Sequence, residues 1–474
     1  MRKRKIIGWL VTVLLTLTCW FWPTEGFGID GLTVVHQRVI AFFVFSACMW
    51  ITEVIPIWGT SVVLMVGLLL TVSDSMLAFM GGESVGTPIP YKSIMSEFAN
   101  PTVMLFMGGF VLAAGATKYR LDANLARVVI GLFGRKPRMV MLGFIVVTAV
   151  LSMFMSNTAT AAMMMAIIAP VLGTLPEDDV RGKTGLTLAI PVAANVGGIG
   201  TPIGTPPNVV AKEYIHSVLN IDINFGEWML VMVPLMLVIL FLSWVFLSHV
   251  FKSSHNEVEV RIDGEWNKSW KAVVVYVTFA VTVVLWLFGE KWLGVNCNVV
   301  ALIPFAVFCI TGVFTREDLG KIDWDVLWLV AGGFALGAAI SKTGLDTLMV
   351  SQIPFSSWSP VGVLVISGLL CLLMSTFMSN SATAAMLIPI IGIVAFAMKD
   401  VYEGLGGSQV VIVGVALSAS LAMSLPISTP PNAIAYSKGF IRQKDMVVTG
   451  LFVGIVGFVL GYLWLIAAGK MGIL

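Results

Sequence analysis

Long apolar runs separated by short polar segments dominate the chain. The first run, Ile6 to Trp22, follows the basic residues Arg2 to Lys5. Ten more runs follow: Val39–Thr52, Ile55–Val72, Val103–Ala116, Leu186–Ala211, Met229–Phe251, Val273–Leu287, Val299–Val313, Val326–Ile340, Val410–Tyr436 and Val447–Ala468. Runs of this kind are typical of membrane-spanning helices. The pattern predicts an all-α polytopic membrane protein with about eleven transmembrane helices. The first lies within residues 1–27, with a cytoplasmic N-terminus.

Two further apolar regions, residues 138–175 and 360–397, each carry a polar tripeptide near the middle. Ser152 opens the segment SMFMSNTATAAM and Ser375 opens STFMSNSATAAM, so the two segments differ at only two positions. Two other blocks recur 224 residues apart, namely Gly108-Gly109-Phe110 with Gly332-Gly333-Phe334, and Thr205-Pro206-Pro207-Asn208 with Thr429-Pro430-Pro431-Asn432. Self-similarity at a fixed spacing indicates a duplicated unit. We predict two repeats, 28–251 and 272–474, joined by a polar cytoplasmic linker, 252–271.

The Lys and Arg residues indicate how regions 138–175 and 360–397 run. If each is a re-entrant hairpin that enters and leaves on one side, most of the 28 Lys and Arg residues lie on the cytoplasmic side. That distribution agrees with the positive-inside rule. If each region crossed the membrane once, Lys252, Arg261 and Arg316 would move outside and the bias would weaken. We therefore predict two hairpins. Matched blocks then lie five spans apart, which inverts one repeat relative to the other.

Composition agrees with a membrane protein, since 58% of residues are hydrophobic and 11% are charged. The five cysteines and four histidines lie outside both repeated motifs, so the sequence indicates neither a metal centre nor a histidine proton relay. An enzyme would need His, Cys or paired carboxylates at membrane depth, and the motifs contain none. Gly108-Gly109 and Gly332-Gly333 are interpreted as close-packing positions. The segment Leu121 to Gly134 is either an amphipathic interfacial helix or the continuation of its span.

The Thr-Pro-Pro-Asn blocks predict broken helices. Pro206 and Pro207 lack N–H donors, so the run Leu186–Ala211 splits near Gly204, and the second block does the same between Ser428 and Asn432. Non-helical backbone survives at membrane depth only where it lines a cavity or meets a ligand. Helix N-termini suit an anion, while carbonyl, hydroxyl and amide oxygens suit a small cation. Paired broken helices in inverted repeats are typical of secondary transporters.

These motifs resemble those of the divalent anion/sodium symporter family, which carries dicarboxylates, citrate or sulfate. The marks are Ser156-Asn157-Thr158, Ser379-Asn380-Ser381, the two Thr-Pro-Pro-Asn blocks and Thr52-Glu53-Val54-Ile55-Pro56. The resemblance implies a homodimer whose protomers each have a scaffold domain and a transport domain that moves like an elevator. One departure is visible: Ser381 stands where the family usually has Thr, which keeps the hydroxyl but puts the substrate's size in doubt.

The resemblance also implies two sodium sites and an anion site. Sodium site 1 would use Ser152, Ser156, Asn157 and the Gly204 carbonyl. Sodium site 2 would use Ser375, the Met378 carbonyl, Asn380 and the Ser428 carbonyl. The substrate site would comprise Ser156, Asn157, Thr158, Thr205, Ser379, Asn380, Ser381, Thr429 and Pro430.

The sequence therefore predicts sodium-coupled import of a C4 dicarboxylate such as succinate, fumarate or malate. Its expected partners are the dicarboxylate, Na⁺ as the co-transported ion, the lipid bilayer of the cell inner (plasma) membrane and a second copy of the chain, with no nucleic acid. The alternatives are a sodium-independent dicarboxylate exchanger and a sodium-coupled citrate or sulfate carrier. From a different class, the alternatives are a channel and a membrane enzyme.

Overall fold

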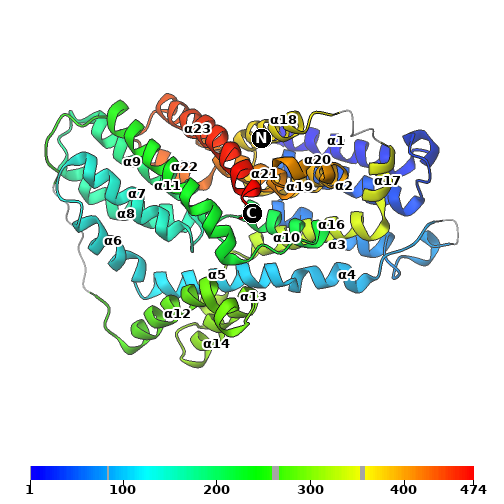
Figure 1. Cartoon of the computed structure of the whole chain (residues 1–474), viewed down its shortest axis with the longest axis horizontal. Helices are drawn as coiled ribbons and strands as arrows, with labels where there is room; N and C mark the ends of the chain where they lie inside the picture. The colour runs from blue at the N-terminus through cyan, green and yellow to red at the C-terminus, as the bar shows by residue number, and fades with distance from the viewer. Residues whose placement is uncertain (1, 83–84, 259–265, 353–357) are drawn as a thin grey trace.

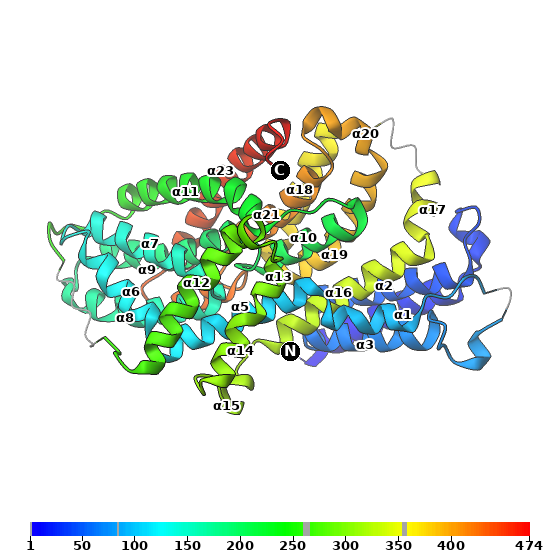
Figure 2. The same ribbon diagram turned by 60° about the horizontal axis from the view of Figure 1, so that its bottom comes forward.

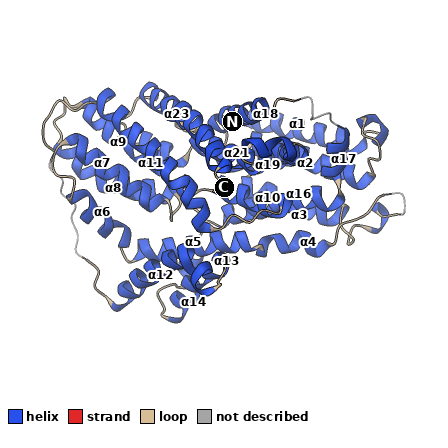
Figure 3. Ribbon diagram, viewed as in Figure 1, coloured by secondary structure: helices blue, strands red, loops and turns tan. Residues whose placement is uncertain are grey.

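The computed structural model describes residues 2–82, 85–258, 266–352 and 358–474. Throughout these ranges the regular structure is helical (Figure 3), and the only strand-like pairing in them is one isolated bridge between Ser73 and Ile89. This confirms the predicted all-α class.

The described residues of the first half form eleven α-helices up to the polar linker. They are α1 (Arg2–Phe21), α2 (Val34–Thr52), α3 (Ile57–Thr71), α4 (Tyr91–Met95), α5 (Pro101–Lys118), α6 (Leu121–Gly131), α7 (Pro137–Ser152), α8 (Asn157–Thr174), α9 (Val180–Gly197), α10 (Pro206–Leu219) and α11 (Phe225–Val250).

The described residues of the second half form twelve. They are α12 (Trp270–Leu293), α13 (Cys297–Val300), α14 (Leu302–Ile310), α15 (Arg316–Leu319), α16 (Trp324–Thr343), α17 (Leu345–Gln352), α18 (Pro360–Phe377), α19 (Asn380–Ala397), α20 (Lys399–Tyr402), α21 (Gln409–Leu421), α22 (Pro430–Tyr436) and α23 (Gln443–Lys470).

Each predicted apolar run lies on one or more of these helices. Within the described ranges, nine helices are long and apolar enough to span a membrane, or ten if the bent pair around α20 and α21 counts as one. Three of the nine, α8, α18 and α19, are arms of the two predicted hairpins. The count differs from eleven because several predicted spans are short or interrupted, such as Ile57–Thr71 and the pair α13 and α14. The polytopic class is confirmed, with nine or more candidate spans.

The two halves share local backbone features. Helix α5 ends at Lys118, and Arg120 takes a left-handed conformation (φ 60°) before α6 begins. Helix α16 ends at Thr343, and Gly344 takes the same conformation (φ 78°) before α17 begins. Because the chain turns at Arg120, α6 is a separate helix and not a continuation of α5. Whether α6 lies along a membrane interface stays a prediction.

The broken helices exchange partners between the halves. Helix α10 follows the first Thr-Pro-Pro-Asn break and packs against α19 and α21 of the second half. Helix α22 follows the second break and packs against α8 and α9 of the first half. In Figures 1 and 2, α10 (green) lies beside α16 and α19, and in Figure 1 α22 (orange) lies among α7, α8 and α9. The second arm of each hairpin, α8 or α19, therefore contacts the broken helix of the opposite repeat.

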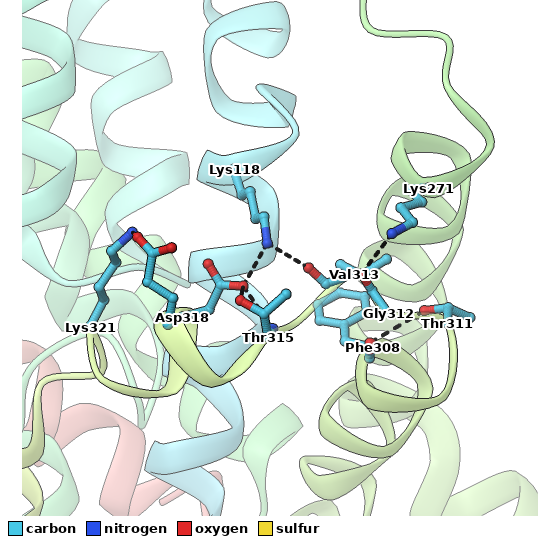
Figure 4. Close-up of polar contacts among 10 residues, drawn as sticks. Lys118, Lys271, Phe308, Thr311, Gly312, Val313, Thr315, Asp318 and Lys321 are labelled. Carbon is cyan, nitrogen blue, oxygen red and sulfur yellow. Dashed lines mark hydrogen bonds and ion pairs between the residues drawn. The ribbon is translucent and has the colours of Figure 1, made fainter.

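Polar contacts tie the end of α5 to α15 and to the segment that precedes it (Figure 4). The Lys118 Nζ atom lies 2.5 Å from Asp318 Oδ2 and donates to the Val313 carbonyl at 2.9 Å. Burial alone would raise the pKa of Asp318, but hydrogen bonds from Lys118 and Thr315 lower it below its usual value. A partly exposed ion pair of this kind contributes at most about 1 kcal/mol. It therefore fixes local geometry more than global stability.

Close helix packing confirms the interpretation for the first glycine of each repeated pair, Gly108 and Gly332, whereas a Cβ atom at Gly333 would meet only ordinary contacts. A Cβ atom at Gly108 would overlap the Ala301 carbonyl, and one at Gly332 would overlap the side chain of Ser61. Gly337 lies on the same helix as Gly332, and a Cβ atom there would meet nothing within 4 Å. Gly108 and Gly332 thus let α5 and α16 approach their neighbours.

We predict that Gly108→Ala and Gly332→Ala lower the melting temperature of the purified protein in detergent, because the added methyl group forces the helices apart. Such overpacking costs roughly 1–3 kcal/mol. The matched control is Gly337→Ala, which should be neutral or stabilise by about 0.5–1 kcal/mol, since alanine is the better helix former. Equal melting temperatures for Gly332→Ala and Gly337→Ala would contradict the packing role.

Candidate functional site

The first helix break is closed by an asparagine from its own motif. Helix α9 and its 3₁₀ extension end at Gly200, and α10 begins only at Pro206, where a missing N–H is tolerated. The fully buried Asn208 donates its Nδ2 hydrogens to the carbonyls of Gly198 (3.2 Å), Ile199 (3.2 Å) and Thr201 (2.8 Å). Leaving a buried carbonyl unpaired costs about 1–3 kcal/mol. Asn208 therefore stabilises the break.

The second break is built in the same way. Helix α21 ends at Leu421 and α22 begins at Pro430. Asn432 Nδ2 donates to the carbonyls of Met423 (2.7 Å) and Leu425 (2.9 Å), which are the repeat counterparts of two acceptors in the first break. The sequence located both breaks correctly. It did not show that the last residue of each motif satisfies the backbone.

The first hairpin tip meets the first break. The hydroxyl of Ser152, at the end of α7, lies 2.7 Å from the Ala194 carbonyl and 2.6 Å from one terminal atom of the Asn157 amide. The same amide atom lies 3.1 Å from the carbonyl oxygens of Gly204 and Ala194. Gly198 makes this approach possible, because a Cβ atom there would lie 2.5 Å from Asn157 Oδ1. Hairpin and break thus share one group of polar atoms.

This group offers two arrangements of the Asn157 amide. With its nitrogen turned inward, the amide donates to Ser152 Oγ, Gly204 O and Ala194 O. With its oxygen turned inward, it completes a set of neutral oxygens from Ser152, Asn157, Gly204 and Ala194, which is the ligand type that a hard monovalent cation takes. Without a bound ion, the inward nitrogen is the arrangement that satisfies its neighbours, because an inward oxygen would face the Gly204 and Ala194 carbonyls, which only accept. The structure brings together three of the four residues predicted for sodium site 1, and sodium binding there stays a prediction.

Ser156, the fourth, has its side chain engaged elsewhere. It is the N-cap of α8, where its hydroxyl accepts the Ala159 N–H at 3.3 Å, and it lies close to the carboxyl group of Asp323. Asp323 precedes α16, so this contact joins the hairpin tip to a helix of the other repeat. Sequence reasoning missed Asp323, which carries no motif. Thr158, the next predicted substrate residue, is exposed.

The second hairpin tip repeats the geometry of the first. Ser375 Oγ lies 2.8 Å from Asn380 Oδ1 and 3.0 Å from the Ala419 carbonyl. Ser428 Oγ donates to the Thr376 carbonyl at 2.6 Å, which ties the second break to the first arm of this hairpin. Met378 directly follows the end of α18 in extended backbone, so its carbonyl is free of the helix ladder. The structure thus places all four residues of predicted sodium site 2 at this hairpin or against it.

The predicted anion ligands lie at helix N-termini. Asn157 and Asn380 are the first residues of α8 and α19, while Thr205 and Thr429 are the N-caps of α10 and α22. N-terminal N–H groups and the positive ends of helix dipoles attract anions. Helix α22 has seven residues and is therefore only about 10 Å long. Because it packs against α8, its first residue, Pro430, lies near that arm of the first hairpin.

The side chains of the other predicted anion ligands differ in exposure. Ser379 and Ser381 are half-buried at the second tip, Pro430 is exposed, and Thr205 and Thr429 are buried.

Asn195 is a site residue that sequence reasoning missed. It lies on α9, is 1% exposed, and donates its Nδ2 hydrogens to Thr429 Oγ1 (3.1 Å) and Asn432 Oδ1 (3.3 Å). This contact joins the first repeat to the Thr-Pro-Pro-Asn motif of the second. The available signal was an asparagine in the apolar run Leu186–Ala211 that lies outside the Thr-Pro-Pro-Asn motif, since polar residues at membrane depth are expensive and mark function.

Two helical hairpins that pack on two interrupted helices, inside a bundle of apolar helices, are typical of membrane transporters. In the described ranges, no group of three or more His, Cys, Asp and Glu side chains is placed to hold a metal ion. The chain belongs to the CitMHS family, described as citrate transporters, whose family model matches residues 47–403. It is a transporter and not an enzyme.

Its relatives include transporters of named substrate. The sodium-dependent dicarboxylate transporter SdcS of Staphylococcus saprophyticus is 29% identical over 488 residues, which cover 96% of this chain and 88% of the relative. SdcS of Staphylococcus aureus is 28% identical over 492 residues, covering 96% and 89%. An uncharacterized transporter of Schizosaccharomyces pombe is 32% identical over 439 residues, covering 90% of this chain and 49% of the relative. The chain thus spans about half the length of that yeast protein.

Two solved structures share the fold. The YdaH transporter of Alcanivorax borkumensis matches with a TM-score of 0.52 and 13% identity, covering 81% of this chain and 88% of that one. MtrF of Neisseria gonorrhoeae, described among antimetabolite efflux pumps, matches with a TM-score of 0.52 and 13% identity, covering 92% and 95%. Likeness at this identity concerns the fold alone.

Proposed function

We propose that this protein imports a C4 dicarboxylate, such as succinate, fumarate or malate, together with Na⁺. The observation that carries the proposal is the close approach of the Ser152 hydroxyl, the Asn157 amide and the carbonyls of Gly204 and Ala194, a group of neutral polar atoms that adjoins the N-terminus of α8. Cation ligands and anion ligands therefore come from the same hairpin tip. The equivalent contacts of Ser375 and Asn380 supply the second half of the site.

Charge balance explains why transport would be coupled. Neither hairpin tip and neither Thr-Pro-Pro-Asn break contains Lys or Arg, so a dianion bound there meets only neutral donors. Transfer of an unbalanced charge into an apolar environment is strongly unfavourable. Sodium ions bound beside the anion compensate its charge, and release of either ligand weakens binding of the other. Relatives named sodium-dependent dicarboxylate transporters support this assignment.

The proposed mechanism is an elevator in a homodimer, in a plasma membrane with the N-terminus in the cytoplasm. We assign the two hairpins and the two broken helices to the moving body, because α8 contacts α9 and α22 while α19 contacts α10 and α21. We assign α1, α2, α3 and α16 to the scaffold, because they pack in sequence against one another. The repeats would be inverted, so that the two hairpins approach the site from opposite sides.

A second candidate is citrate in place of a C4 dicarboxylate, and the description of the family as citrate transporters favours it. Ser381 in place of threonine removes a methyl group from the second tip, which leaves more room for a larger acid. Sulfate transport and sodium-independent exchange are the remaining alternatives within this class. Measurement of uptake against substrate concentration distinguishes a channel from all of these carriers, because uptake by a carrier saturates and conduction by a channel does not.

We expect purified protein in liposomes to accumulate labelled succinate when Na⁺ is supplied outside, with saturable kinetics. Replacing Na⁺ by K⁺ or choline should reduce uptake to that of empty vesicles, because the anion loses its compensating charge. Unlabelled fumarate and malate should compete, whereas sulfate should not. Succinate uptake that stays unchanged without Na⁺ would contradict coupling, and stronger competition by citrate would reassign the substrate.

The two hairpin asparagines provide the matching mutational test. We predict that Asn157→Ala and Asn380→Ala each reduce sodium-driven uptake by roughly tenfold or more, since hydrogen bonds to a charged ligand contribute about 1.5–3 kcal/mol. The matched control is Asn298→Ala, which alters a partly exposed asparagine on α13. All three variants should elute as monodisperse protein. Normal uptake by both hairpin variants would refute the assigned site.

A further inference from the structure

The hydrogen bonds around Asn195 have only one consistent polarity. Asn432 presents its amide to the carbonyls of Met423 (2.7 Å) and Leu425 (2.9 Å), which only accept, so the facing atom is Nδ2. The Oδ1 atom of Asn432 therefore points toward Asn195, 3.3 Å away, and must receive a donor. That requirement fixes Asn195 with its NH₂ group toward the second break. The same NH₂ group donates to Thr429 Oγ1 at 3.1 Å.

The Thr429 hydroxyl receives a second donor from its own helix. Thr429 is the N-cap of α22, and its Oγ1 accepts the Asn432 N–H at 3.3 Å. A hydroxyl group has two lone pairs and one proton. Because N–H donors occupy both lone pairs, Thr429 has only its proton left to offer. The hydroxyl is thereby committed to donate to whatever ligand meets the second break.

The first break lacks this device. At the 224-residue spacing of the Thr-Pro-Pro-Asn blocks, Asn195 aligns with Ala419, whose side chain has no donor to offer. Correspondingly, Oδ1 of the fully buried Asn208 has no hydrogen-bond partner among the described residues, and Thr205 makes no side-chain cap in α10. The first break is therefore left with an unused acceptor oxygen, while the second break has a committed donor. Asn195 makes the two halves chemically unequal.

We propose that Asn195 is a positioning residue that commits the Thr429 hydroxyl to donate a hydrogen bond to a carboxylate of the transported anion. The proposal rests on the proposed function, in which Thr429 contacts the substrate. It assigns one carboxylate of the dicarboxylate to the second break and leaves the acceptor oxygens of the first break to the cation. Loss of Asn195 should therefore weaken anion affinity while sodium activation stays close to normal.

The test replaces Asn195 by aspartate, which has the same shape but accepts where the amide donates, and by alanine. For each variant the KM for succinate, the maximal rate and the dependence of uptake on Na⁺ are measured in liposomes. Asn195→Ala frees one lone pair of Thr429 and should raise the KM for succinate roughly tenfold, as expected for one weakened hydrogen bond to a charge. Asn195→Asp places an acceptor against Thr429. The carboxylate then accepts the hydrogen bond that the Thr429 hydroxyl would donate to the substrate, so this variant should raise the KM for succinate more than Asn195→Ala does. Measured at succinate concentrations that saturate each variant, the half-saturating Na⁺ concentration of Asn195→Ala should change less than twofold.

Two controls separate positioning from structure. Thr187→Ala alters another buried polar residue of α9, whose hydroxyl bonds only to the Lys183 carbonyl of its own helix, and should leave the KM unchanged. Thr429→Ser keeps the hydroxyl and should stay close to wild type, whereas Thr429→Val should match Asn195→Asp. If the Asn195 variants do not fold, as shown by loss of a melting transition, the Thr429 pair still decides whether a hydroxyl donor is needed.

The outcomes also separate this inference from the proposed function. Equal effects of Ala and Asp at Asn195, or a loss of maximal rate with unchanged KM, would overturn the positioning role while sodium-driven succinate uptake by the wild type stands. If the wild type carries no succinate, the proposed function fails. The variants are then compared by thermal stabilisation with citrate and with sulfate in Na⁺, where unchanged stabilisation of both Asn195 variants overturns the inference as well.

Discussion

The constraint on which the rest of the structure depends is the need to pair every backbone group exposed by a broken helix in an apolar bundle. Asn208 and Asn432 meet this need, because each places its amide nitrogen against the carbonyls that the interrupted helix leaves open. Once the breaks are stable, two helix N-termini and several carbonyl oxygens are available for ligands. A transporter needs such groups, and a continuous helix cannot supply them.

The chemistry of the site follows from its neutrality. The hairpin tips and the breaks supply hydroxyl, amide and carbonyl groups but no formal charge, so they hold neither an acid nor a cation strongly alone. In the proposed function the two would compensate each other when bound side by side, which would make coupling a property of the site and not of a distant gate. The exchange of partners by α10 and α22 packs the predicted ligands of both repeats together, and the proposed elevator would move them as a unit.

Much of this arrangement could be predicted from the sequence because its causes are local. Apolar runs marked the helices, consecutive prolines marked the breaks, and the repeated tripeptides marked the hairpin tips. The remaining features depend on tertiary packing. The bond from Asn195 to Thr429 joins residues 234 positions apart, and the contact of Ser156 with Asp323 joins two repeats without any shared motif. The separation of α6 from α5 depends on the left-handed backbone conformation of one residue, Arg120, and an arginine gives no sequence signal for that conformation.

The central claim is that Asn157 turns its oxygen toward Ser152 and Gly204 to hold Na⁺. The most direct measurement is a pair of high-resolution cryo-EM maps of the full-length protein, one in saturating NaCl and one in choline chloride. The account predicts density between Ser152 Oγ, the Asn157 amide and the Gly204 carbonyl in sodium, at about 2.3–2.6 Å from each oxygen, and its loss in choline. A map in saturating sodium that shows no ion density there, with the Asn157 nitrogen at hydrogen-bond distance from the Gly204 and Ala194 carbonyls, would contradict the claim.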